Sequence, residues 1–112
     1  MPILNIHTNL PIGDKEPLLK KASALVAEAL AKPEGYVMIR ISDHESMSFA
    51  GTTEPLAYVE LKSIGLEIEQ TTSLSETLCS FISENLGIEP ARIYIEFAAP
   101  ERGMFGWNSG TF

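Results

Sequence analysis

The feature that most constrains the fold is an order of elements that occurs twice along the chain. In each half, an aliphatic strand is followed by an amphipathic helix, a proline (Pro33 or Pro90) and a second aliphatic strand. This order predicts a duplicated β-α-β unit, over about residues 2–55 and 56–112, within a single domain spanning 1–112. Because such crossovers are right-handed, the two strands of each unit are expected to be parallel. The expected fold class is therefore α/β, with a four-stranded mixed sheet and two helices on one face.

The spacing of apolar residues predicts where each element lies. Strands are expected over 3–8, 36–42, 56–64 and 92–97, where aliphatic residues dominate or alternate with polar ones. The first helix is predicted between a cap at Asp14 and a stop at Lys32-Pro33. The second is predicted from a capping box over 73–76 to Gly87. The apolar stripes are Leu18, Leu19, Ala22, Leu25, Val26, Ala29 and Leu30 in the first helix and Leu74, Leu78, Phe81, Ile82 and Leu86 in the second.

Two helices can cover only one side of a four-stranded sheet. The other side is expected to carry Met38, Arg40, Tyr58, Glu60 and Lys62, or the residues that alternate with them. A chain as short as this one is expected to hide such a mixed face by forming an oligomer.

Composition and charge exclude several classes of partner. Eight Lys and Arg against 15 Asp and Glu give a net charge of −7, which would repel nucleic acid and anionic membranes. The single Cys79 can close no internal disulfide, and neither His7 nor His44 has a partner at metal-ligand spacing, so no metal site is expected. The lack of a signal peptide or membrane-spanning run predicts a cytoplasmic location. Secretion by a route that needs no signal peptide stays open.

Pro2 is the first candidate for chemistry. A proline in second place ordinarily allows removal of the initiator methionine, which would leave a secondary amine with a pKa near about 7.7 to 8.0. Burial in an apolar pocket would lower that pKa, so the amine could remove a proton from a carbon beside a carbonyl. The alternative is that Met-Pro is an ordinary start with no role in catalysis.

The other candidates each have a structural interpretation as well. Lys32 would either complement the dipole at the end of the first helix or anchor a substrate carboxylate. Tyr94 would be a surface tyrosine or a hydrogen-bond donor in a pocket. Phe105, Trp107 and Phe112 are typical of core or interface packing, in a glycine-punctuated tail over 103–112.

Several short runs, in order and over the whole chain, carry a resemblance to a known family. They are Met1-Pro2, Thr8-Asn9-Leu10-Pro11, Lys32-Pro33 with Tyr36, the segment 47–55, Ser63-Ile64-Gly65, Arg92-Ile93-Tyr94-Ile95 and the segment 106–112. Together they resemble the macrophage migration inhibitory factor family. The resemblance implies a homotrimer in which short strands extend each sheet across subunits, with active sites between neighbours. It also implies an isomerase: a keto–enol tautomerase of phenylpyruvate, hydroxyphenylpyruvate and dopachrome-type compounds that needs no cofactor.

The resemblance implies roles for individual residues. Pro2 matches the catalytic base, Lys32 the residue that binds the substrate carboxylate, and Ile64 the residue whose backbone N–H contacts the substrate oxygens. Tyr94 matches a pocket tyrosine contributed by the adjacent subunit. The aromatic positions around the pocket are matched by Tyr36, Trp107 and Phe112, while Phe105 stands where the family more often has a smaller aliphatic residue.

Two departures from the family pattern change what is expected. Glu96 stands where animal members commonly have an asparagine that binds the distal end of the substrate, and an ionised carboxylate accepts hydrogen bonds but cannot donate them. A changed preference for ring-hydroxylated substrates is therefore expected. The Cys-x-x-Cys motif of animal members is Leu56-Ala57-Tyr58-Val59 here, which excludes thiol-disulfide chemistry at this place.

Two alternative functions stay open at this point. One is a cytokine-like signalling or binding protein with a vestigial pocket, for which binding depends on surface loops. The other is a related proline-first decarboxylase or dehalogenase. Those enzymes bring further arginines or acids into the pocket, and the arginines available here are Arg40, Arg92 and Arg102.

Overall fold

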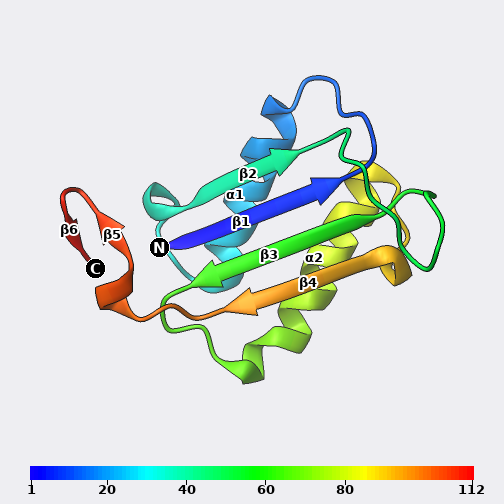
Figure 1. Cartoon of the computed structure of the whole chain (residues 1–112). Coiled ribbons are helices and arrows are strands. Elements are labelled where there is room, and N and C mark those ends of the chain that lie inside the picture. The colour runs from blue at the N-terminus through cyan, green and yellow to red at the C-terminus, as the bar shows by residue number, and fades with distance from the viewer.

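The computed structural model describes all 112 residues and shows two helices packed on one face of a four-stranded sheet (Figure 1). The elements of the sheet layer are β1 (Pro2–Thr8), β2 (Met38–Ser42), β3 (Ala57–Ser63) and β4 (Ile93–Ala98), and the helices are α1 (Glu16–Leu30) and α2 (Thr71–Leu86). Short 3₁₀ turns lie at η1 (Glu34–Tyr36), η2 (Ile68–Gln70), η3 (Pro90–Arg92) and η4 (Arg102–Met104). A hairpin of β5 (Gly106–Trp107) and β6 (Gly110–Thr111) projects from one end of the sheet.

The sheet has the order β2-β1-β3-β4. β1 is parallel to β2 and β3 is parallel to β4, whereas β1 and β3 are antiparallel at the centre. The predicted fold class and the parallel pairing within each β-α-β unit are therefore confirmed. Neither helix is long and apolar enough to span a bilayer.

The core lies between the sheet and the helices. Side chains alternate along each strand, so every second residue of β1 and β3 faces the helices. The buried cluster joins these positions to the apolar stripes of the helices, and its members include Leu4, Ile6, Ala22, Val26, Leu30, Val59, Leu61, Leu74, Leu78, Ile82, Ile88 and Ile93. The predicted stripes are confirmed at their centres, but Ala29 is exposed, so its assignment was wrong, and four members are only half-buried: Leu19, Leu25, Phe81 and Leu86.

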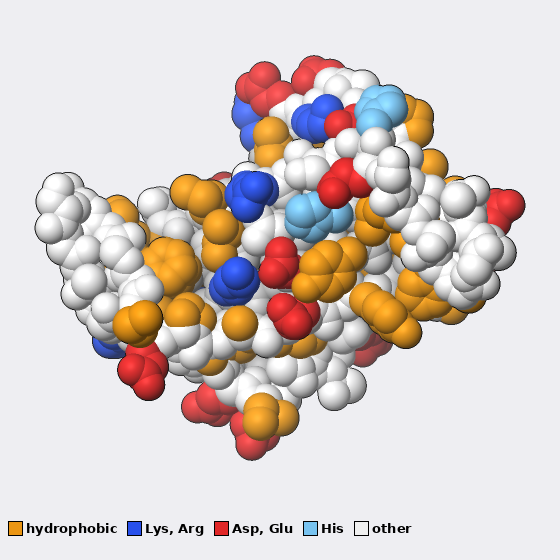
Figure 2. All heavy atoms as spheres, in the orientation of Figure 1, with side chains coloured by type: hydrophobic (Ala, Val, Ile, Leu, Met, Phe, Trp, Pro, Cys, Tyr) orange, Lys and Arg blue, Asp and Glu red, His pale blue; other side chains and the backbone are white.

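The opposite face of the sheet has no helix over it. Met38 and Arg40 of β2 are exposed there, and Tyr58, Glu60 and Lys62 of β3 are half-buried, as the alternation predicts. Figure 2 shows acidic, basic and histidine side chains gathered over the middle of this open face, with hydrophobic side chains around them.

At the centre of the open face, Asn5 is only 4% exposed, and its side-chain oxygen is buried without a hydrogen-bond donor. Such an acceptor is costly to leave unpaired.

Three predicted boundaries were wrong. Asp14 is not the cap residue of α1: the helix follows Lys15, although the Asp14 carboxylate still accepts a hydrogen bond of 3.1 Å from the Glu16 N–H. The capping box over 73–76 is also not used, because α2 begins at Thr71. The first turn is instead set by η2, where Glu67 and Gln70 form a reciprocal capping box that leads directly into α2.

The third boundary concerns β2, which begins at Met38 rather than at residue 36. Residues 34–36 form the turn η1, closed by hydrogen bonds from the Tyr36 and Val37 amides to the carbonyls of Pro33 and Glu34. This turn lifts Tyr36 out of the sheet, toward the end at which β1 begins.

Candidate active site

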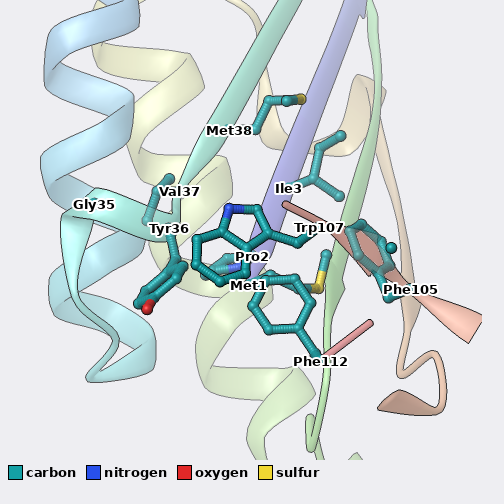
Figure 3. A pocket seen from close by; sticks show the side chains of 11 residues that line it. Met1, Pro2, Ile3, Gly35, Tyr36, Val37, Met38, Phe105, Trp107 and Phe112 are labelled. Atoms are coloured by element: carbon teal, nitrogen blue, oxygen red, sulfur yellow. The ribbon is translucent and has the colours of Figure 1, made fainter. Parts of the chain in front are cut away.

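A cavity of about 230 Å³ lies where β1 begins, at the end of the sheet next to the projecting hairpin. Pro2 is fully buried and forms part of its wall. Figure 3 shows the side chains of Pro2, Met1, Trp107 and Phe112 gathered at this end of β1. The lining is mainly hydrophobic and comes from the strand β1, the η1 turn with the start of β2, and the tail: Met1, Pro2, Ile3, Gly35, Tyr36, Val37, Met38, Phe105, Gly106, Trp107 and Phe112.

Aromatic rings of the tail form one wall of the cavity. Trp107 stacks on Phe112 with ring centroids 5.4 Å apart, and Tyr36 meets Trp107 edge-on at the same distance of 5.4 Å. The hairpin holds this arrangement because β5 and β6 are joined by Asn108 and Ser109, which both have positive φ, as a tight hairpin turn requires. The Phe112 N–H also donates to the Phe105 carbonyl at 3.1 Å, which draws the last residue back onto the wall.

Lys32 lines a second hollow, of about 390 Å³, which adjoins the cavity. The two share Met1, Tyr36, Trp107 and Phe112, so Lys32 lies across the N-terminus from the aromatic wall. Its position follows from the end of α1, where Ala31 has a left-handed conformation and the Lys32 N–H donates to the Ala27 carbonyl at 3.0 Å. The chain therefore turns back toward the start of β1.

The chemistry of the N-terminus is altered by this environment. Burial lowers the pKa of the Met1 amino group below its ordinary value of 8.0, and the positive charges of Lys32 and Arg102 lower it further. The apolar wall and these two cations act on the amino group in the same direction, toward its uncharged form.

Ile64 lies beside the N-terminus because of strand register. Pro2 pairs with Ser63 across the antiparallel β1–β3 ladder, and Ile64 is the next residue along the chain. It is buried, and Gly65 follows with φ of +81°, where the chain leaves the sheet. The predicted residues Pro2, Lys32, Ile64, Tyr36, Phe105, Trp107 and Phe112 are therefore brought to one end of the sheet.

Tyr94 and Glu96 are not brought to that end within one chain. Tyr94 pairs with Tyr58, which pairs with His7, so it lies five residues along β1 from Pro2, or about 17 Å in the strand direction. It is 67% exposed and packs edge-on against Phe49 with ring centroids 4.8 Å apart.

A third hollow, of about 410 Å³, is formed around this second aromatic pair. Glu96 lies on the open face, where its carboxylate accepts a hydrogen bond of 3.5 Å from the Tyr58 hydroxyl. Burial, together with the charges of Glu60 and Glu96, raises the pKa of that hydroxyl. Tyr94 and Glu96 therefore do not line either of the hollows beside Pro2 within one chain.

Met38 and Arg102 are among the lining residues that the sequence did not indicate as part of a site. Met38 lines the cavity because the parallel register sets it opposite Ile3, a placement that alternation alone does not give. Arg102 lines the hollow with Lys32, but its sequence neighbours carry no pattern beyond the charge itself. No group of three or more His, Cys, Asp or Glu side chains converges in a way that could hold a metal ion.

The fold and the cavity define a small α/β protein with the tautomerase fold, built from a duplicated β-α-β unit. The chain belongs to the macrophage migration inhibitory factor family, whose family model matches residues 1–112. A homolog from Brugia malayi is 40% identical over 114 residues, which cover 100% of this chain and 99% of that protein.

Solved structures agree. The crystal structure of a homologue from Prochlorococcus marinus is 44% identical and superposes with a TM-score of 0.94 over 98% of each chain. The structure of the factor from Trichinella spiralis is 36% identical, with a TM-score of 0.94 over 98% of this chain and 99% of that one.

Proposed function

We propose that this protein is a cofactor-independent keto–enol tautomerase of aromatic 2-keto acids such as phenylpyruvate, hydroxyphenylpyruvate and dopachrome-type compounds. The observation that carries the proposal is the position of Pro2, buried in the wall of an aromatic cavity, with Lys32 in the adjoining hollow. Removal of Met1 would make the Pro2 nitrogen the N-terminal amine of the chain.

In the proposed reaction, Pro2 acts first as a base and then as an acid. The uncharged secondary amine removes a proton from the carbon next to the ketone, and the resulting ammonium returns a proton to the oxygen or carbon of the enolate. Atoms balance because the proton only changes position within the substrate. The apolar wall and the two nearby cations favour the uncharged amine that the first step requires.

Substrate binding uses charge at one end and aromatic surface at the other. Lys32 would attract the carboxylate of a 2-keto acid, and the backbone N–H of Ile64 would donate to its oxygens. The rings of Tyr36, Trp107 and Phe112 would stack on the substrate ring and exclude water, which strengthens the charge interactions. Phe105 narrows the cavity between the tail and β1.

The proposal includes a homotrimer, because Tyr94 and Glu96 lie too far from Pro2 to serve the same cavity within one chain. A neighbouring subunit would bring its Tyr94 to the mouth of the cavity, with its Glu96 near the distal end of the substrate. The uncovered face of the sheet and the projecting β5–β6 hairpin both favour such contacts.

The placement of the arginines counts against the decarboxylase and dehalogenase alternatives. Arg92 donates its hydrogen bonds to loop carbonyls of residues 49–55, and Arg40 lies on the open sheet face. Arg102 alone lies near the N-terminus. A site with one arginine and no acidic side chain among its lining residues favours tautomerisation.

An enol-absorbance assay tests the proposal. Protein whose N-terminus has been shown by mass spectrometry to be Pro2 is expected to interconvert phenylpyruvate tautomers, and Pro2→Gly is expected to lower kcat/KM by about 100-fold or more. Gly keeps a primary amine, so the variant tests the proline ring and its pKa rather than the presence of an amine. Equal rates for the wild type and Pro2→Gly would disprove the proposal that the proline ring and its pKa are needed for catalysis.

A further inference from the structure

Arg102 is a second cation next to the proposed carboxylate anchor. It is the first residue of η4, and it lines the same hollow as Lys32, Met1 and Tyr36. The turn is closed by hydrogen bonds from the Met104 N–H to the Glu101 carbonyl at 2.9 Å and from the Phe105 N–H to the Arg102 carbonyl at 3.2 Å. Because Phe105 also lines the cavity, one short turn leads from Arg102 directly into the aromatic wall.

The two cations of the hollow have no partner in the chain. Neither Lys32 nor Arg102 forms an ion pair or a side-chain hydrogen bond, and no Asp or Glu side chain lines the hollow. Among the other basic residues, Lys15 binds Asp43 at 3.1 Å, Lys20 binds Glu16 at 3.4 Å and Lys62 binds Glu60 at 3.8 Å, whereas Lys21 and Arg40 are exposed and do not line the hollow. The chain has a net charge of −7, so two unpaired cations make the charge around this hollow opposite in sign to that of the whole chain.

We propose that Arg102 is a substrate-positioning residue that binds the carboxylate of the substrate together with Lys32. This inference rests on the proposed function and specifies how its site would hold the substrate carboxylate. A guanidinium group presents a planar fork that fits a carboxylate through two parallel hydrogen bonds, whereas an ammonium group acts as a point charge. Arg102 thus orients the carboxylate through its planar fork, and Lys32 adds a second positive charge that holds it.

The division of work between the two cations follows from their surroundings. Lys32 is half-buried at the end of α1, whereas Arg102 is exposed at the rim. The rim position suits capture of an anion from solvent. Both charges also favour the uncharged form of an amine at the start of β1, so a bound carboxylate would partly offset that effect and raise the affinity of the base for its proton.

Binding of a substrate analogue that cannot tautomerise separates this inference from the proposed activity. Trp107 is the only tryptophan and lies in the wall of both hollows, so its fluorescence reports occupancy directly. The probes are 3-phenylpropionate and its neutral isostere 3-phenylpropanamide. The variants are Arg102→Ala, Arg102→Lys and the matched control Lys21→Ala, which removes an exposed, unpaired charge from α1.

The expected result is selective for charge. Arg102→Ala should raise the Kd for 3-phenylpropionate about tenfold and leave the Kd for the amide within about twofold, because the amide has no charge to lose. Arg102→Lys should recover about half of the loss on a logarithmic scale, since it keeps the charge without the fork. Lys21→Ala should match the wild type for both probes.

Two outcomes would overturn the inference: an unchanged Kd for the carboxylate in Arg102→Ala, or an equal loss for carboxylate and amide, which would indicate disturbed packing around Phe105. The tautomerase proposal is judged separately by the Pro2 assay. Charge-selective binding without tautomerase activity would leave Arg102 as an anion-binding residue and reject the reaction. Tautomerase activity with no effect of Arg102 on carboxylate binding would support the reaction and reject the role of Arg102.

Discussion

The guanidinium group of Arg92 lies over the ring of Phe49, with its central carbon 5.3 Å from the ring centroid. The same group donates hydrogen bonds to the carbonyls of Pro55 at 2.9 Å, Glu54 at 3.0 Å and Phe49 at 3.2 Å. Phe49 in turn packs against Tyr94. Arg92 therefore ties the long loop between β2 and β3 to the start of β4, at the end of the sheet opposite Pro2.

Arg92→Ala should destabilise the protein by about 2 kcal/mol, because several carbonyls lose a charged donor at once. Urea unfolding followed by circular dichroism measures this change. Arg92→Lys should recover only part of the loss, since an ammonium group cannot span the same set of carbonyls. The importance assigned to this contact is rejected if Arg92→Ala unfolds at the same urea concentration as the wild type.

Lys32→Ala should shift the pH profile of catalysis as well as weaken substrate binding. The base must be uncharged, so kcat/KM rises as pH increases through its pKa. Lys32 lowers the pKa of an amine at this end of β1, and its removal should therefore raise that pKa and move the rising limb to higher pH. Rates measured from pH 5 to pH 9 give the limb directly. A variant that loses rate equally at every pH would show that Lys32 does not influence the base.

Asp43 should govern part of the acid sensitivity of the fold. The Ile12 N–H, which donates to its carboxylate at 2.9 Å, and the ammonium group of Lys15 hold the pKa of Asp43 at about 2, below the ordinary value of 3.8. Because the pKa of Asp43 is lower in the folded protein than in the unfolded chain, its carboxylate stabilises the fold at pH values above 3.8. This stabilisation is lost as pH falls from 3.8 towards about 2.

Asp43→Asn should therefore be less stable than the wild type at pH 6, with the difference shrinking as the pH falls to 2. Thermal unfolding at several pH values provides the measurement, and Asp14→Asn, at an exposed acid on the loop between β1 and α1, serves as control. A difference that stays constant with pH would contradict the assignment.

Mixed oligomers should test whether neighbouring subunits share a site. Pro2→Gly and Tyr94→Ala each damage every site when present alone. In randomly mixed trimers, a subunit with an intact Pro2 meets a neighbour with an intact Tyr94 in about a quarter of the sites. Refolding the two variants together should thus restore about a quarter of the wild-type rate. If Pro2 and Tyr94 acted within one chain, mixing would restore nothing.

Much of the fold could be predicted from the sequence because its signals are local. Alternation gave the four strands, and the order of elements gave their parallel pairing. The start of α2 could not be predicted from Ser73 and Glu76, because Glu67 and Gln70 form a capping box nearer the N-terminus, on the turn that leads into the helix. When two possible capping boxes lie within a few residues of each other, the tertiary path of the chain determines which of them forms.

The candidate site could be predicted only where strand register or family resemblance supplied the link. Ile64 and the aromatic tail were assigned through the resemblance, and the pairing of Pro2 with Ser63 shows why Ile64 lies beside the N-terminus. Arg102 and Met38 could not be found, since the position of Arg102 depends on the turn η4 and that of Met38 on the register of β2 with β1. The distance between Tyr94 and Pro2 could be derived only once the order and register of the strands were known.

The side chain of Met1 lines both the cavity and the hollow beside Lys32. Under the proposed function, its cleavage does two things in one step: it converts an amide nitrogen into a basic one, and it clears a thioether from the space a substrate ring would fill. A newly made chain is then a zymogen whose activating protease is the housekeeping methionine aminopeptidase. Preparations produced faster than that enzyme can trim them would contain dormant copies, and their specific activity would report the extent of trimming.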